Sequence, residues 1–153
     1  MTYSSETKRT IAGAVAGLLY GLVLAFLSLG AVGAGHGTPI PLYVSSAPLS
    51  VFSLLPDASS VREPVFFAML FAQPLVWLVP GWLVALGGRK AGIAAGLLAL
   101  HYACGLAVVA MTGVSPRGIA GELPDFFVIW LPVYFVGQAV LWWQISRQLR
   151  RTG

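Results

Sequence analysis

The sequence predicts an all-α integral membrane protein, with four transmembrane helices arranged as two tandem hairpins. Of its 153 residues, 58% are hydrophobic and 9% are charged, whereas a soluble domain averages about 25% charged residues. Four stretches lack any Asp, Glu, Lys or Arg: 10–33, 64–88, 91–116 and 126–146. Each can form a helix that crosses a bilayer, which needs roughly 20 apolar residues. Their continuous apolar character favours helices over barrel strands, in which apolar and polar residues would alternate.

The basic residues predict the orientation of these helices. With the N-terminus inside, seven basic residues lie on the inner side and only Arg62 and Arg117 lie outside. This asymmetry follows the positive-inside rule. It predicts a multi-pass protein of a bacterial inner (plasma) membrane, with both termini in the cytoplasm. The basic residues form short flanks suited to lipid headgroups, and we expect no nucleic-acid partner.

The first helix is expected from about Thr10 to Gly33. Gly13, Gly17 and Gly21 recur every four residues, a spacing that lets a second helix backbone come close in lipid. This glycine ridge predicts packing inside the chain, with a seam between two copies as the alternative. We expect the helix to be retained rather than cleaved as a signal peptide, because its apolar run exceeds the usual 7–15 residues.

A long outer loop, at about residues 34–60, follows the first helix. Its beginning is rich in glycine and proline, which disfavours a helix there, yet its later part is apolar. Ser46 followed by Pro48 is a typical helix start, so we expect a short interfacial helix with its apolar side toward the lipid. His36 and Thr38 are candidate ligand-binding residues of this loop, although a histidine in a glycine-rich turn is usually only solvated.

The second, third and fourth helices follow at short intervals. Residues 60–63 read Ser-Val-Arg-Glu, a capping box that predicts the start of a helix continuing to about residue 86. We expect the third helix at about 91–113 and the fourth at about 124–147. Prolines inside the apolar runs predict kinks, at Pro74, Pro80 and Pro132.

An internal repeat groups these helices into two halves. Residues 12–19 read A-G-A-V-A-G-L-L, residues 91–98 read A-G-I-A-A-G-L-L, and six of the eight positions agree. We expect a single domain over residues 1–153, in which hairpin 1 (10–87) and hairpin 2 (89–147) are parallel repeats. The outer loop would then be an insertion in the first hairpin, and Gly92 and Gly96 would pack as their counterparts do. A chance match is the alternative, because these residue types are common here.

A polar layer is expected halfway across the membrane. Counting from the centre of each helix at 1.5 Å per residue puts six polar side chains within about 5 Å of one level: Tyr20, Gln73, His101, Tyr102, Tyr134 and Gln138. His101 is the one that titrates near neutrality. The layer is interpreted either as interhelical hydrogen bonding, worth about 0.6 kcal/mol per bond, or as a polar site.

The predicted function is that of a non-catalytic structural or accessory subunit of a larger membrane assembly. The apolar runs hold no charged side chain, whereas ion-coupled carriers and pumps normally bury such groups. We expect no metal or cofactor, since His36 and His101 would lie roughly 15 Å apart in depth, and a single cysteine excludes an intrachain disulfide. The expected partners are the lipid bilayer and other membrane subunits or a second copy. The alternative is a small channel or carrier for a neutral or weakly polar solute, with a constriction at His101.

Overall fold

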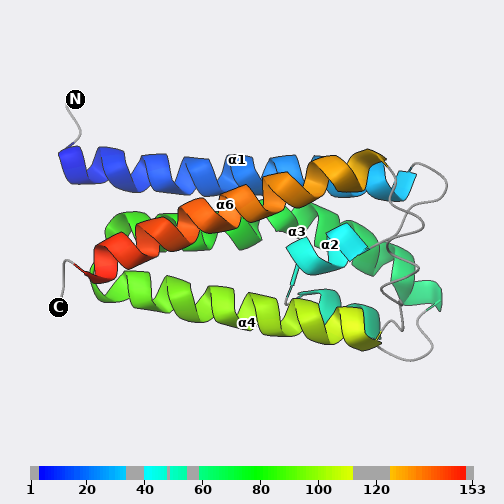
Figure 1. The fold of residues 1–153 in the computed structure, drawn as a ribbon. Helices are drawn as coiled ribbons and strands as arrows, with labels where there is room; N and C mark the ends of the chain where they lie inside the picture. Colours follow the sequence, from blue (N-terminus) through cyan, green and yellow to red (C-terminus); the bar gives the residue numbers. More distant parts are fainter. Residues whose placement is uncertain (1–3, 34–39, 48, 55–58, 112–124, 151–153) are drawn as a thin grey trace.

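The computed structural model describes residues 4–33, 40–47, 49–54, 59–111 and 125–150. Within them, four helices are long and apolar enough to cross a membrane. They are α1 (Ser5–Gly33), α3 (Ser59–Leu86), α4 (Arg89–Met111) and α6 (Asp125–Leu149). The predicted all-helical chain with four long apolar helices is therefore confirmed. The helices run in alternating directions, and α1 begins at the same end of the bundle at which α6 finishes (Figure 1).

Local side chains and backbone explain where these helices begin and end. The Ser4 hydroxyl accepts a hydrogen bond from the backbone N–H of Thr7 at 3.2 Å, which caps α1 and extends it ahead of the predicted start. Gly87 and Gly88 form the turn between α3 and α4 with φ values of 73° and 56°. This left-handed conformation strongly favours glycine, so the turn predicted there has a direct backbone cause.

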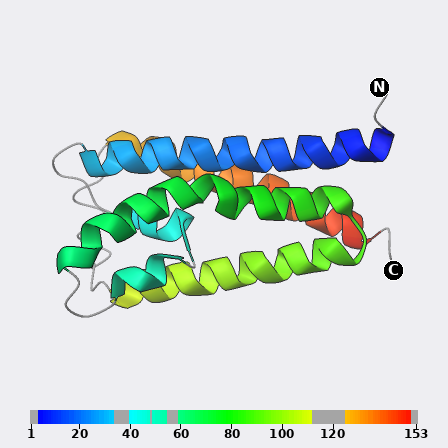
Figure 2. The same ribbon diagram turned by 180° about the vertical axis from the view of Figure 1, so that it is seen from behind.

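Proline does not interrupt the helices. Pro64, Pro74 and Pro80 all lie inside the single helix α3, and Pro132 lies inside α6. Figure 2 shows that α3 is bent along its length, as expected where proline removes backbone hydrogen bonds.

The glycine ridge of α1 packs against α3 within the same chain. A β-carbon added to Gly13 would lie 2.7 Å from the carbonyl oxygen of Gly81 on α3, and one added to Gly21 would lie 2.6 Å from the Cα of Pro74. At Gly17 it would overlap the carbonyl oxygen of Trp77. Only glycine allows two backbones to approach this closely, so α1 and α3 are joined by the small residues of the first repeat.

The second copy of the repeat has the opposite environment. Gly92 and Gly96 are exposed on α4, and a β-carbon added to either would meet no atom within 4 Å. The prediction that these two glycines pack as Gly13 and Gly17 do is wrong within this chain. The reason is that α4 turns its other side, which carries Ala94, Leu98 and His101, toward the bundle.

Part of the outer loop enters the bundle. A short helix, α2 (Ile40–Ser45), lies against α1, α3, α4 and α6 and is followed by the 3-10 helix η1 (Leu49–Leu54) (Figure 1). The buried residues of this inserted segment, Ile40–Ala47, include Ile40, Leu42, Ser45 and Ala47. The short helix predicted after Ser46 occurs as the 3-10 helix η1 rather than as an α-helix, and α2, which was not predicted, precedes it. Within residues 40–47, the apolar side chains of Ile40, Leu42 and Ala47 are covered by protein, whereas Val51 of η1 is exposed.

Candidate functional site

The inserted segment brings free backbone carbonyls into the bundle. A helix leaves its last carbonyl groups without partners, and irregular backbone is tolerated at membrane depth only where protein or water satisfies it. Trp77 Nε1 donates a hydrogen bond to the carbonyl of Ser45 at 3.1 Å, and His101 Nδ1 lies 2.8 Å from the carbonyl of Ala47. Two side chains, from α3 and α4, therefore cap the end of α2.

The partners of His101 fix its tautomer. A carbonyl can only accept a hydrogen bond, so Nδ1 must carry the proton that is shared with Ala47. The other ring nitrogen, Nε2, lies 3.1 Å from the Tyr134 hydroxyl, and in a neutral ring it accepts a hydrogen bond from that hydroxyl. His101 thus connects the inserted segment on one side to α6 on the other. With 3% of its surface exposed, it has no nitrogen left for a solute.

A second set of hydrogen bonds runs in one direction through the layer. Trp142 Nε1 donates to the hydroxyl of Tyr102 at 3.0 Å, and Tyr102 donates to Oε1 of Gln138. Gln138 Nε2 donates to the hydroxyl of Tyr20 at 3.2 Å, which in turn donates to the backbone carbonyl of Tyr134 at 2.8 Å. Every donor in this chain of bonds has an acceptor, and together they connect α1, α4 and α6.

Gln73 makes a separate set of hydrogen bonds. Its side-chain amide is fully buried and donates to the hydroxyls of Ser45 and Ser28. Ser45 in turn donates to the carbonyl of Pro41. Gln73 therefore ties α3 to both α1 and the inserted segment. Its Oε1 atom is buried, with no hydrogen-bond partner among the described residues.

Aromatic rings surround His101. The Trp77 ring meets it edge-on, with centroids 4.7 Å apart, and the Tyr134 ring is stacked at 6.3 Å. Trp130 stacks on the far face of this group, 4.8 Å from Tyr134. Rings in edge-on or offset contact add about 0.5–1.5 kcal/mol each beyond area burial. The geometry holds the imidazole in one orientation.

A small cavity borders His101. It has a volume of about 160 Å³ and lies between α3 and α4. Apart from His101, its walls are formed by apolar and aromatic side chains and Ala47, among them Val76, Trp77, Leu97 and Leu98. A path for a polar solute needs polar groups that replace water along its walls, and this cavity offers the ring of His101, whose nitrogens are both occupied.

The structure brings five of the six predicted polar residues into contact: Tyr20, His101, Tyr102, Tyr134 and Gln138. The sixth, Gln73, bonds instead to Ser45 of the inserted segment and to Ser28 of α1. Sequence reasoning missed Ser28, Ser45, Trp77 and Trp142. One available signal was that Trp77 follows Gln73 by four residues and so shares its helix face.

The candidate loop residues His36 and Thr38 lie outside the described residues. No group of three or more potential metal ligands occurs within the described part of the chain.

Tyr20→Phe tests whether the directional chain of bonds contributes to stability. The variant loses the bond to the Tyr134 carbonyl and leaves Gln138 Nε2 without its acceptor. We expect the free energy of unfolding in detergent to fall by about 1 kcal/mol, between the average and the maximum measured for interhelical bonds in membranes. Tyr43→Phe is the matched control, since Tyr43 is half-buried outside the layer. Equal stability of the two variants would contradict a stabilising role for the layer.

No protein-family profile, curated protein or solved structure matches this chain. Its function must therefore be inferred from its own geometry.

Proposed function

We propose that this chain is a non-catalytic structural subunit of a larger membrane assembly, docking through the outward face of α4. The inferred location is a bacterial inner membrane with both termini in the cytoplasm. Basic residues of α1, α4 and α6 gather at one end of the bundle, where α1 begins and α6 finishes (Figure 1). This agrees with the positive-inside rule. We further propose that the two hairpins arose by duplication, on the strength of the octapeptide repeat.

The observation that carries the proposal is the composition of the exposed face of α4. The buried residues of this helix lie along one side. At 3.6 residues per turn, the opposite side carries an exposed stripe of six small residues: Gly92, Gly96, Ala99, Ala103, Ala107 and Ala110. In lipid, where apolar surface alone does not drive helices together, small residues at this spacing permit the close approach that does.

The two copies of the repeat strengthen this interpretation. In the first copy the backbone of α3 sits against Gly17, whereas Gly96, at the equivalent position, faces open space. A second glycine helix with the same spacing therefore lacks the partner that its counterpart has within the chain. A transmembrane helix from another subunit, or from a second copy of this chain, would fit there in the same way.

A channel or carrier is not favoured by a specific observation. The cavity beside His101 is lined almost wholly by apolar side chains. Both nitrogens of the ring already have partners, and α2 of the inserted segment contacts all four long helices. A solute would have to displace these groups to pass the level of His101.

Gly96→Leu tests the proposed docking face. The chain would be purified from its native membrane in a mild detergent, and the mass of the assembly measured. We expect a complex of fixed stoichiometry for the unaltered chain. Gly96→Leu should reduce the complex by roughly tenfold or more, because overpacking a close helix contact costs about 1–3 kcal/mol.

Ala139→Leu is the matched control, since Ala139 is an exposed small residue on α6. Its complex should equal that of the unaltered chain. An unaltered chain that remains a monomer in its native membrane would refute the proposal. So would a complex that Gly96→Leu leaves intact.

A further inference from the structure

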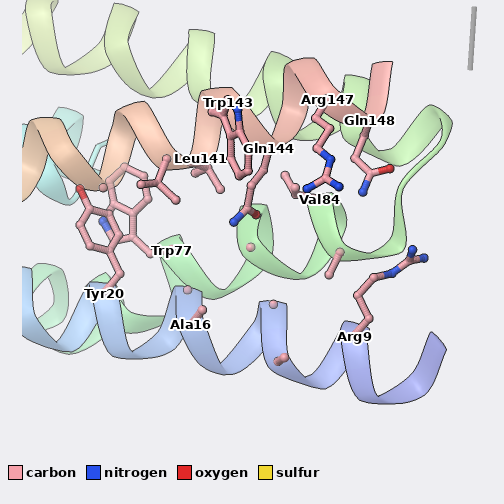
Figure 3. A pocket seen from close by; sticks show the side chains of 17 residues that line it. Arg9, Ala16, Tyr20, Trp77, Val84, Leu141, Trp143, Gln144, Arg147 and Gln148 are labelled. Atoms are coloured by element: carbon pink, nitrogen blue, oxygen red, sulfur yellow. The ribbon is translucent and has the colours of Figure 1, made fainter. Parts of the chain in front are cut away.

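A cavity lies away from α4, in a wedge between α1 and α6. The two helices lie close together near the start of α6, and α6 then diverges toward its C-terminal end (Figure 1). The space between them has a volume of about 620 Å³, with α3 as its floor. Figure 3 shows this cavity from close by, with Tyr20 and Trp77 at its inner end.

The walls of the cavity are largely apolar, with the side chain of Gln144 from α6 as a polar exception (Figure 3). On α1 they include Ala12 and Ala16, exposed small residues that leave room beside the helix. On α6 they include Val140 and Trp143, which are both exposed. Tyr20 closes the far end because its ring lies directly over Gly137, leaving no room there for a β-carbon. A flexible apolar chain could enter from the surrounding lipid without moving the backbone.

Two arginines stand at the open end of this apolar space. Arg9 extends from α1 and Arg147 from α6, and their side chains lie at the same end of the cavity, beside Gln148 (Figure 3). The Arg147 guanidinium also lies 5.6 Å from the centre of the Trp143 ring. Among the described residues, neither arginine has an ion pair with a carboxylate. Arginine binds phosphate oxygens in a bidentate geometry.

The length of the cavity matches one lipid chain. Arg9 and Tyr20 are eleven residues apart on one helix, or about 16 Å at 1.5 Å per residue. The hydrocarbon core of a bilayer is roughly 30 Å thick, so the acyl chains of one leaflet extend about 15 Å. A phosphate between the two arginines would thus allow an acyl chain to reach Tyr20.

We propose that this cavity binds an anionic phospholipid of the bilayer, with its phosphate between Arg9 and Arg147 and one acyl chain along Ala12–Tyr20. The inference does not rest on the proposed docking function, since α4 contributes nothing to this cavity. The occupant would fill the wedge that the divergence of α6 leaves open.

Titration with phosphatidylglycerol, followed by native mass spectrometry of the purified chain, tests the proposal. We expect one lipid to bind more tightly than the rest, and more tightly than phosphatidylcholine. The double variant Arg9→Gln, Arg147→Gln should weaken this binding roughly thirty-fold, about fivefold for each arginine near a headgroup. Ala16→Trp, which fills the wall of the cavity, should weaken it as well.

The matched control is the double variant Arg89→Gln, Lys90→Gln, which removes the same charge at the same end without touching the cavity. It should bind the first lipid within about twofold of the unaltered chain, since neither residue lines the cavity. If both double variants lost affinity for phosphatidylglycerol equally, the proposal would be overturned, because general electrostatic attraction to anionic lipid would explain the binding. Equal affinity for phosphatidylcholine, or a polypeptide found in the cavity in place of lipid, would also overturn it.

Discussion

Gly17→Leu is expected to prevent α1 from packing on α3. A β-carbon at this position would overlap the carbonyl oxygen of Trp77 and lie 3.0 Å from the Cα of Leu78. Both are backbone atoms, so no side-chain rotation relieves the overlap and the helices must separate. Overpacking usually costs about 1–3 kcal/mol, and we expect the upper end or more here. The variant should give little folded protein, measured as the monodisperse fraction after detergent extraction.

Gly96→Leu is the matched control within the same chain, because it occupies the equivalent position in the second copy of the octapeptide. A β-carbon there would meet nothing within 4 Å, so the monomer should fold as the unaltered chain does. If Gly17→Leu folded normally, the close contact between α1 and α3 would be wrong. If both variants failed to fold, the outward orientation of Gly96 would be wrong instead.

His101→Leu is expected to release the inserted segment while leaving the long helices in place. Leucine has a similar size but cannot donate to the Ala47 carbonyl or accept from the Tyr134 hydroxyl. Two interhelical hydrogen bonds are lost, each worth about 0.6–1.7 kcal/mol in membranes. We expect the free energy of unfolding to fall by about 1–3 kcal/mol. The backbone amides of Ser46 and Leu49, which bond to Leu42 and Ser46, should exchange hydrogen faster.

His101→Asn serves as the rescue variant, because its side-chain amide can still donate to the Ala47 carbonyl. Exchange at Ser46 and Leu49 should return toward that of the unaltered chain, although Tyr134 remains without its acceptor. Unchanged exchange in His101→Leu would contradict the assignment of His101 as the cap of the inserted segment.

The long helices could be predicted from the sequence because their cause is local. Continuous apolar runs without charge specify a membrane helix directly, and the glycine turn at residues 87–88 stands between two of them. The ends were less predictable. Helix α1 begins at Ser5 rather than near Thr10 because Ser4 caps it, which adds a polar turn that hydrophobicity does not indicate.

The inserted segment could not be placed from the sequence. An apolar loop must be covered, but composition does not say whether lipid or protein covers it. Whether lipid or protein covers the inserted segment depends on hydrogen bonds between residues that are distant in the sequence. These join Gln73 to Ser45, Trp77 to the Ser45 carbonyl, and His101 to the Ala47 carbonyl. Two of these partners are backbone atoms, which leave no mark in the sequence.

The polar layer was predictable in depth but not in connectivity. Counting helical rise placed Tyr20, Tyr102 and Gln138 at one level, and they do bond to one another. Depth alone does not tell which side of a helix faces inward. For the same reason the repeat did not reveal that Gly96 faces outward while Gly17 faces α3, since nearly identical octapeptides have opposite surroundings.

Site-directed cross-linking from α4 in the native membrane tests the proposed docking face most directly. In a Cys104→Ser background, a single cysteine would be placed either at Gly96 on α4 or at Ala139 on α6, both exposed, and treated with a short thiol-reactive cross-linker. We predict a protein adduct of one defined mass from position 96 and none of comparable yield from position 139. Equal adducts from both positions, or lipid adducts alone from position 96, would contradict a subunit that docks through α4.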